Sequence, residues 1–265
     1  IGLIIASCSK KDVKESLIKE KDLELQVLEA YKEGKVSLEQ GDVLYAARKF
    51  NEAEILYPQS DWASRSALMA AYSYYIQDYY IDAEAELLRF IKVYPKSINL
   101  DYAYYLLAVT YFEQIVDEKK DLKSIINAKN YFNIVIKNYP NTSYAIDASF
   151  KINLINDILA SKEIYLGRYY LDKKKWIPAI NRFKTVVNNY DTTIYIEEAL
   201  HRLVEIHFTL GLKEESEKYA KLLGYNYQSS QWYEMTYSVF NEMYKTQSLD
   251  KKDKSFVQKV KSLFN

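Results

Sequence analysis

The sequence is poor in the residues that interrupt helices. It has 4 prolines and 6 glycines among 265 residues, about a third of the roughly 12% that these two residues usually make up. Such a chain favours long helices over many short strands. Its single cysteine excludes a disulfide-stapled fold. A hydrophobic fraction of 49% excludes a disordered chain and is sufficient for a substantial core.

Neither sign of charge is in excess, and motifs that carry chemistry are missing. The 36 Lys and Arg residues balance 36 Asp and Glu residues, so we expect no nucleic-acid partner, because phosphate binding needs a basic surface. The sequence contains no HExxH motif, no CxxC pair and no glycine-rich phosphate loop. His201 and His207 lie about 240° apart around a helix, so they cannot share a metal from one face. We therefore expect no metal, no cofactor and no enzymatic activity; an enzyme would need a polar cleft with a perturbed acid or base.

The one cysteine lies near the N-terminus, directly after small residues. The run Ile5-Ala6-Ser7-Cys8 resembles a bacterial lipobox, in which small residues precede the cysteine that receives lipid. A frayed apolar end with an incidental cysteine is the alternative. We expect Cys8 to carry a covalent lipid anchor and residues 1–7 to be the remnant of a signal peptide. Residues 8–26, charged and free of aromatics, are then a hydrated tether. By resemblance, Ser9 after the cysteine implies sorting to the outer membrane.

One phrase recurs along the rest of the chain, and its spacing indicates a helical repeat. Successive copies begin 37, 45, 51 and 37 residues apart, a period typical of helical-hairpin arrays. The proline of the phrase cannot continue the preceding helix, and the hydroxyl residue after it can cap the next one. The copies are Tyr57-Pro58-Gln59-Ser60, Tyr94-Pro95-Lys96-Ser97, Tyr139-Pro140-Asn141-Thr142, Tyr190-Asp191-Thr192-Thr193 and Tyr227-Gln228-Ser229-Ser230.

Small and large residues at fixed offsets from this phrase match the tetratricopeptide (TPR) pattern, as at Ala46 and Phe50 in the first copy. We therefore predict an all-α, TPR-type helical-hairpin solenoid of about five repeats plus a capping helix. A charged loop at Val116–Leu122 accounts for the spacing of 45, and an added or extended helix at Ser143–Leu159 for the spacing of 51. The predicted repeats are 27–58, 62–95, 101–140, 143–191 and 194–228, followed by a cap at 231–245 and a tail at 246–265.

The tail ends in a segment with an apolar face. A helix over residues 254–265 would carry lysines beside that face, which suits a partner-binding or membrane-surface helix. A disordered tail is the alternative. The apolar residues on the face are Phe256, Val257, Val260, Leu263 and Phe264.

Tyrosine is unusually frequent, with 27 copies. In a TPR hairpin the first helix lines the concave groove, and several tyrosines of the first three repeats occupy those positions. Tyrosine buries a ring while keeping a hydroxyl available, which is favoured at interfaces. Two interpretations stay open. The rings pack between repeats, or several of them form a groove for an extended peptide with aromatic side chains.

Several longer phrases are more specific than the repeat pattern. They include Asp61-Trp62-Ala63-Ser64-Arg65, Tyr102-Ala103-Tyr104-Tyr105-Leu106, Gly167-Arg168-Tyr169-Tyr170-Leu171 and Glu198-Ala199-Leu200-His201-Arg202-Leu203. With the lipobox and the tether, they resemble the BamD (ComL) family of outer-membrane protein assembly lipoproteins over about Leu23–Lys245. The resemblance implies a lipid-anchored scaffold of the β-barrel assembly (BAM) complex, on the periplasmic face of the outer membrane of a Gram-negative bacterium.

The resemblance also implies partners and surfaces. The partners are the periplasmic POTRA domains of the barrel subunit BamA, other BAM subunits and unfolded outer-membrane proteins. The predicted surface towards BamA is in the fourth repeat, with Arg168, Lys173 and Arg182 as charge donors. The predicted groove for the aromatic-ended signal of substrates consists of Tyr31, Arg65, Tyr72, Tyr75 and Tyr105.

One departure and one alternative bear on these roles. The Lys/Asn carboxylate clamp of chaperone-binding TPRs is replaced by Tyr31, Met69 and Leu106, so we do not expect recognition of an acidic tail in that manner. The alternative function is a periplasmic TPR lipoprotein adaptor for peptidoglycan synthesis or cell division. That adaptor would copurify with cell-wall enzymes rather than with BamA.

Overall fold

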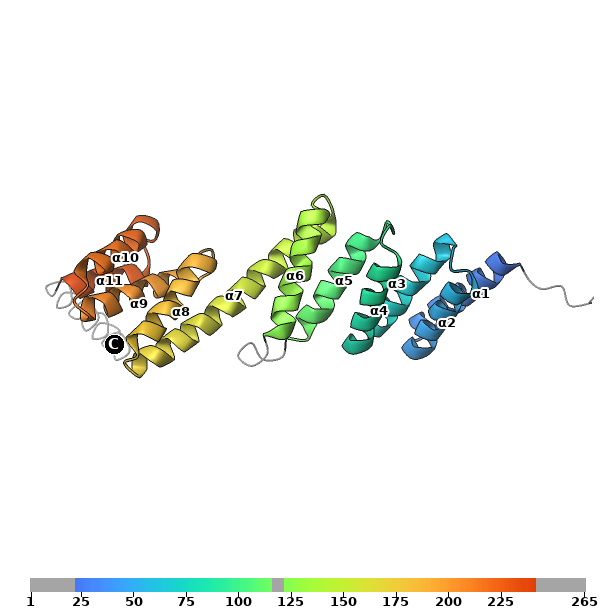
Figure 1. Cartoon of the computed structure of the whole chain (residues 1–265), viewed down its shortest axis with the longest axis horizontal. Coiled ribbons are helices and arrows are strands. Elements are labelled where there is room, and N and C mark those ends of the chain that lie inside the picture. The colour runs from blue at the N-terminus through green and yellow to red at the C-terminus, as the bar shows by residue number, and fades with distance from the viewer. Residues whose placement is uncertain (1–21, 116–121, 242–265) are drawn as a thin grey trace, which may run out of the picture. The chain divides into compact units, whose positions relative to one another are not determined.

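The computed structural model describes residues 22–115 and 122–241, and all regular structure in these ranges is helical (Figure 1). Residues 8–21 of the predicted tether, with Cys8, most of the predicted charged loop and the predicted tail lie outside the described residues. The predicted tether ended too late, because its residues 23–26 form the first turn of a helix that begins after the N-cap Asp22. The helices are α1 (Leu23–Glu39), α2 (Val43–Leu56), α3 (Asp61–Tyr75), α4 (Tyr80–Val93), α5 (Leu100–Glu113), α6 (Lys123–Asn138), α7 (Ser143–Asp172), α8 (Trp176–Asn189), α9 (Ile196–Thr209), α10 (Lys213–Asn226) and α11 (Gln231–Phe240).

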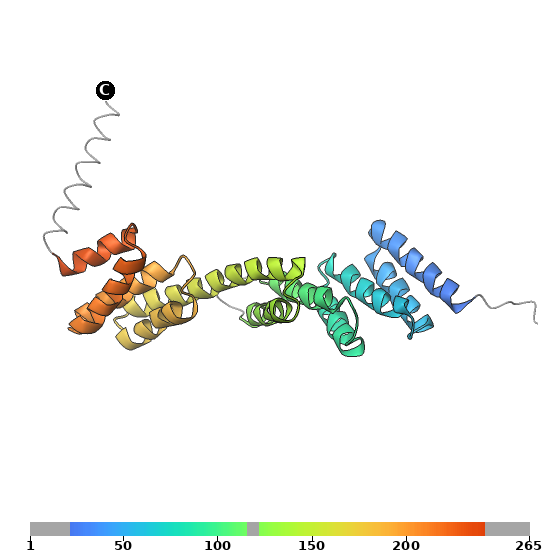
Figure 2. The same ribbon diagram turned by 90° about the horizontal axis from the view of Figure 1, so that it is seen from above.

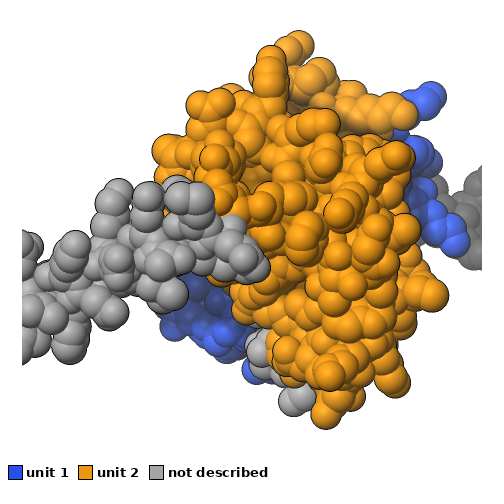
Figure 3. Space-filling model, turned by 90° about the vertical axis from the view of Figure 1, so that its left-hand side faces the viewer, with its two compact units in different colours: residues 1–103 blue, residues 104–265 orange. Residues whose placement is uncertain are grey.

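Successive helices pair into hairpins, as the repeat pattern predicts. α1 packs on α2, α3 on α4, α7 on α8 and α9 on α10, and aromatic rings join α5 to α6, for example Tyr111 and Tyr131. The predicted all-α TPR class is therefore confirmed. The chain divides into two compact units, residues 1–103 and residues 104–265 (Figure 3). Each unit is described by itself below; α5 begins in the first and continues in the second.

The repeated phrase ends one helix and begins another. Its tyrosines are the C-cap residues of α2, α4, α6, α8 and α10. Two of its hydroxyl residues are N-caps that accept a backbone N–H. The Thr142 hydroxyl accepts from Ala145 at 3.2 Å, and the Ser230 hydroxyl accepts from Tyr233 at 3.0 Å. Such caps satisfy amides that the first helical turn leaves without a partner.

The second helix of each hairpin buries the same three positions. A small residue is followed four and seven positions later by residues on the same face, and all are buried except Ala220, which is partly buried. In the fifth repeat the small residue is Ser216, whose hydroxyl donates to the Val204 carbonyl at 3.0 Å. The sets are Ala46, Phe50 and Ala53; Ala83, Leu87 and Phe90; Ala128, Phe132 and Val135; Ala179, Phe183 and Val186; and Ser216, Ala220 and Leu223.

Two glycines let the helices of a hairpin approach closely. A Cβ added at Gly34 would lie 3.0 Å from the Phe50 ring, and one added at Gly167 would lie 2.6 Å from the Phe183 ring. Both rings are fully buried. The aromatic ring of the second helix therefore occupies the space that a side chain on the first helix would need.

The turns inside four hairpins share one backbone conformation. Gly41, Asp78, Lys174 and Gly211 have φ values of 83°, 61°, 56° and 77°. In the fourth hairpin the amide of Lys175 donates to the Tyr170 carbonyl at 2.9 Å, and that of Lys174 donates to Leu171 at 2.8 Å. These two bonds form a Schellman motif, which needs a left-handed residue.

Replacing Lys174→Gly should stabilise the fourth hairpin. A side chain in the left-handed region costs about 1–2 kcal/mol, and glycine avoids this cost, although it loses more conformational entropy on folding than lysine does. We expect the free energy of unfolding to rise by about 0.5–1 kcal/mol in urea titrations. The matched control is Lys173→Gly at the preceding residue, where φ is −84°. That change should lower stability, so a gain from both variants would contradict this account.

The long spacing between the third and fourth copies corresponds to one helix. α7 runs without interruption from Ser143 to Asp172 (Figure 2), so the predicted insertion is an extension rather than an added helix. Thirty residues make a helix about 45 Å long. α7 packs against both α6 and α8. At the C-terminus, α11 ends at Phe240, whereas the cap was predicted to reach residue 245; residues 242–245 lie outside the described ranges.

Candidate functional site

A hollow of about 500 Å³ lies in the first unit, where the predicted groove begins. Three predicted residues line it: Tyr31 from α1, and Arg65 and Tyr72 from α3. The remaining lining residues are Leu68, Met69, Ile98, Asn99 and Tyr102.

Aromatic stacking fixes the polar groups of this hollow. The Tyr31 ring packs on Phe50 and Trp62, with centroids 5.3 and 4.9 Å apart. The Arg65 guanidinium lies 5.6 Å from the centroid of the Trp62 ring. Burial raises the pKa of the Tyr31 phenol, and the charge of Arg65 opposes that rise. A cation held over an aromatic face beside a neutral phenol can attract a carboxylate and stack with a ring.

Arg65 also borders a second, more polar hollow. This hollow has a volume of about 570 Å³ and lies between the first two Tyr-Pro turns. Arg65, Ile98 and Asn99 line both hollows. Ile98 is 85% exposed. An extended segment could therefore place an aromatic side chain in the first hollow while its polar end reaches the second.

Two of the predicted groove tyrosines do not line the hollow. Tyr75 stacks on Tyr72 and on Tyr80, at 6.5 and 6.3 Å between centroids. Tyr105 belongs to the second unit, where its hydroxyl donates to Asp147 at 2.6 Å and its ring lies 5.1 Å from Tyr144. Tyr105 of α5 thus packs on α7. This residue follows the other interpretation of the tyrosines, in which the rings pack between repeats.

The three cations predicted to face BamA lie on α7, at its end and on α8. The Arg168 Nε donates to Glu198 at 2.5 Å, and its Nη2 donates to the other carboxylate oxygen. Arg182 Nη1 lies 3.1 Å from Glu163. Lys173 is exposed at the C-cap of α7. Two of these side chains therefore tie neighbouring helices together, and Lys173 extends into solvent.

Glu198 belongs to a larger polar cluster on α9. Its side chain is 5% exposed, and Arg202 Nε lies 3.7 Å from Glu198 Oε1. Arg202 also pairs with Glu205 at 2.6 Å, and His201 Nε2 lies 3.5 Å from Glu205. Burial alone would raise the pKa of Glu205, but hydrogen bonds from His201 and Arg202 outweigh it and lower that pKa to about 2. Glu205 is thus ionised at neutral pH.

Residues 22–115 and 122–241 contain neither a cluster of metal-binding side chains nor a helix that could span a membrane. No group of three or more His, Cys, Asp or Glu side chains there could hold a metal ion. No helix of the described residues is long and apolar enough to cross a bilayer. His201 instead contacts the Thr236 hydroxyl at 2.8 Å, and His207 contacts the Leu203 carbonyl at 2.7 Å.

Comparison with known proteins places this architecture in a family. The sequence profile of the family YfiO, described as "Outer membrane lipoprotein", matches residues 24–222. The chain belongs to the YfiO family. One relative, "Outer membrane protein assembly factor BamD" of Rickettsia prowazekii, is 41% identical over 240 residues, which are 90% of this chain and 93% of that protein. A protein of the same name from Caulobacter vibrioides is 40% identical, over 91% of this chain and 78% of its own length.

Solved structures give a weaker likeness to this member of the YfiO family. A tetratricopeptide repeat protein from Parabacteroides merdae is 13% identical and has a TM-score of 0.37, over 88% of this chain and 80% of that protein.

Sequence reasoning missed part of the hollow. Met69, Ile98 and Asn99 line it but were not predicted to bind substrate. Ile98 and Asn99 directly follow the second Tyr-Pro phrase, so the turn position was the available signal. The pattern of helix faces could not supply it, because both residues precede α5.

Proposed function

We propose that this protein is a lipid-anchored scaffold of the outer-membrane β-barrel assembly complex. The observation that carries the proposal is 41% identity over 93% of the length of a protein named outer membrane protein assembly factor BamD. The lipobox-like run at Cys8 supports a covalent lipid anchor at the periplasmic face of the outer membrane. In this role the repeats bind other proteins, and no catalytic step is required of them.

Docking on the POTRA domains of BamA is assigned to the C-terminal repeats. Lys173 is the candidate contact that can be tested most cleanly, because it is exposed and stands at the end of α7. Arg168 and Arg182 also hold Glu198 and Glu163 within the chain. Replacing either arginine would therefore remove an ion pair within the chain as well as a charge from the surface.

The test of docking is a titration of the lipid-free chain from Ser9 onward with the POTRA domains of BamA from the same organism. We expect saturable binding that weakens with Lys173→Glu and not with Lys92→Glu, a matched change at an exposed lysine of α4 in the first unit. Absence of binding at tens of micromolar, worth about 6 kcal/mol, would contradict docking. Copurification with cell-wall enzymes would then support the adaptor for peptidoglycan synthesis or cell division.

Substrate recognition is assigned to the hollow around Tyr72 and Arg65. Its aromatic walls suit the aromatic side chains of an unfolded outer-membrane protein, and Arg65 suits a terminal carboxylate. Tyr75 does not line the hollow and acts in this proposal by supporting the neighbouring ring of Tyr72. Tyr105 packs on Tyr144 in the second unit and has no part in the proposed site.

Two substitutions should separate the aromatic part of recognition from the charged part. Tyr72→Ala should weaken binding of a peptide with an aromatic C-terminal residue at least tenfold, about 1.4 kcal/mol, because it removes a wall of the hollow. Arg65→Gln should weaken binding of the peptide that ends in a free carboxylate. It should leave the affinity for the same peptide with an amidated C-terminus unchanged. Fluorescence titration measures both affinities.

The matched control for the aromatic wall is Tyr79→Ala. Tyr79 is an exposed tyrosine of the same unit, and it does not line the hollow. If Tyr72→Ala binds the peptide as tightly as the Tyr79→Ala control does, the hollow is not the substrate site.

A further inference from the structure

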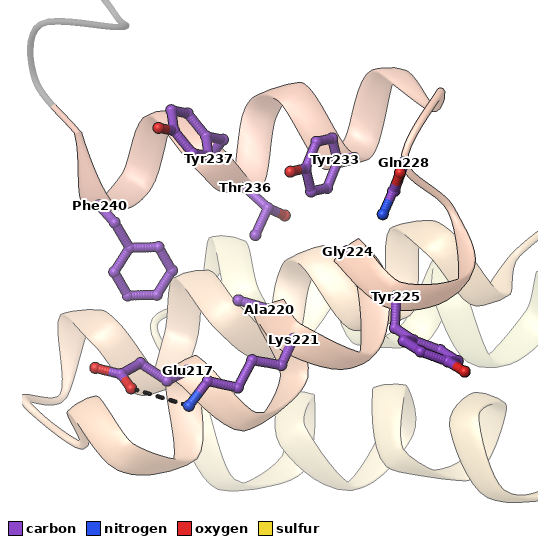
Figure 4. A pocket seen from close by; sticks show the side chains of 10 residues that line it. All are labelled: Glu217, Ala220, Lys221, Gly224, Tyr225, Gln228, Tyr233, Thr236, Tyr237 and Phe240. Atoms are coloured by element: carbon purple, nitrogen blue, oxygen red, sulfur yellow. Dashed lines mark hydrogen bonds and ion pairs between the residues drawn. The ribbon is translucent and has the colours of Figure 1, made fainter.

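An apolar hollow of about 710 Å³ lies between α10 and α11, far along the chain from the proposed substrate site. Figure 4 shows Thr236 and Phe240 pointing from α11 towards α10, with Ala220 on the facing helix. Gly224 of α10 contributes no side chain to the wall. Tyr225 at the rim is 86% exposed. Such an apolar opening is a candidate binding surface.

The hollow exists because α11 is held mainly by α9 and only partly by α10. The Thr236 hydroxyl contacts His201 Nδ1 at 2.8 Å, the Trp232 ring lies 5.3 Å from the His201 ring, and the Phe240 ring lies 5.3 Å from the Phe208 ring. α11 packs more extensively on α9 than on α10. The corresponding helix α3, by contrast, packs extensively on α2, the helix directly before it. The Tyr233 ring of α11 lies over Gly224 of α10, and beside this contact the space between the two helices is left open.

The order of the repeats indicates what belongs in this space. α11 follows the fifth copy of the repeated phrase, with Ser230 as its N-cap, as α3 and α7 follow earlier copies. It is thus the first helix of a sixth hairpin. In each of the preceding hairpins a second helix packs along the first, and within the described residues α11 has no such partner.

We propose that residues 254–265 of this chain dock in the hollow as that second helix. Phe256, Val260 and Leu263 have the spacing of the buried sets in the other second helices, four and then three residues apart. Twelve residues form a helix about 18 Å long, against about 21 Å for the 14 residues of α10.

The length of the connection permits this docking. Asn241 follows Phe240, which itself lines the hollow. Residues 242–253 can span up to about 40 Å when extended, more than the length of either wall. A segment already attached beside the hollow has a high effective concentration there, which favours it over a second copy of the chain.

Cysteine pairs test the proposal in the full chain. Cys8 is the only cysteine, so a Cys8→Ser background contains no other thiol. Tyr225→Cys is combined with Phe256→Cys, Val260→Cys or Leu263→Cys, and mild oxidation is followed by non-reducing electrophoresis. We expect a monomeric cross-link in at least one pair, forming at least tenfold faster than when Ile177→Cys replaces Tyr225→Cys. Ile177 is a 74% exposed position on α8 of the same unit.

An additional substitution in the cross-linking variants distinguishes docking from random collision of the tail. Tyr237→Glu places a charge in the wall of the hollow and should slow the cross-link at least tenfold. Tyr165→Glu, at a similarly exposed tyrosine of α7, should not. Rates equal to the Ile177→Cys control for all three tail positions would overturn the proposal. A cross-link found only in dimers would overturn it in favour of a second copy.

Discussion

Phe183→Ala is expected to lower the free energy of unfolding of the second unit by about 3–5 kcal/mol. The Phe183 ring is fully buried in a cluster with Ile164, Leu200 and Leu203. Its removal loses the transfer free energy of the ring and leaves a cavity against Gly167. Urea unfolding followed by tryptophan fluorescence measures the change. In a Trp62→Phe background the remaining signal comes from Trp176 and Trp232, which lie in the second unit.

A second substitution at the same contact makes the test sharper. Gly167→Ala alone should destabilise by about 1–3 kcal/mol, because its methyl group would lie 2.6 Å from the Phe183 ring. In the Phe183→Ala background the methyl group has room, and the better helix propensity of alanine should then stabilise by up to about 1 kcal/mol. An effect of Gly167→Ala with the same sign in both backgrounds would contradict this contact. Ile177→Ala, at an exposed position of α8, is the control.

Arg168→Ala should destabilise the same unit by about 2–3 kcal/mol. Arg168 is half-exposed, but its partner Glu198 is 5% exposed and would remain as a buried charge. Breaking such a pair from one side costs about 3–5 kcal/mol when both partners are buried. We expect less here, because Arg202 Nε still lies 3.7 Å from Glu198 and because solvent screens the exposed end of Arg168.

Two further variants show whether the buried carboxylate is the cause. Arg168→Ala combined with Glu198→Ala should lose less stability than the sum of the single changes, because no charge remains unpaired. Arg182→Ala should cost about 1 kcal/mol or less, since its partner Glu163 is more exposed than Glu198. Equal losses for Arg168→Ala and Arg182→Ala in thermal or urea unfolding would contradict the difference in burial. These stability changes must also be measured before any loss of BamA binding is assigned to either arginine.

The sequence predicts the helix ends and the core because both depend on local spacing. Each tyrosine of the repeated phrase proved to be a C-cap, and Phe50, Phe132 and Phe183 are buried. The extension of α7 was predicted only as added or extended helix. The choice follows from the absence of glycine and proline between Ser143 and Leu166, since no residue there ends the helix.

The site was less predictable, because it depends on how helices face one another. Tyr31 and Tyr105 occupy equivalent positions of the repeat pattern, yet Tyr31 lines the hollow and Tyr105 packs on Tyr144 and Asp147. Helical periodicity places both on the first helix of a hairpin and cannot tell which neighbour covers them. The pair of Arg168 and Glu198 joins residues 30 positions apart, so no local pattern could reveal it.

Because α7 is uninterrupted, the number of its residues sets the direction in which the fourth hairpin leaves it. Each residue of an α-helix advances 1.5 Å and turns about 100°. The spacing of 51 is 14 residues more than the spacing of 37 found at both ends of the array. These residues add nearly four whole turns, so the fourth hairpin leaves α7 within about 40° of the direction it would have without them. An insertion of two residues would instead swing that hairpin by about 200° without unfolding it. An insertion in α7 therefore keeps the direction of the fourth hairpin only when it adds close to a whole number of turns.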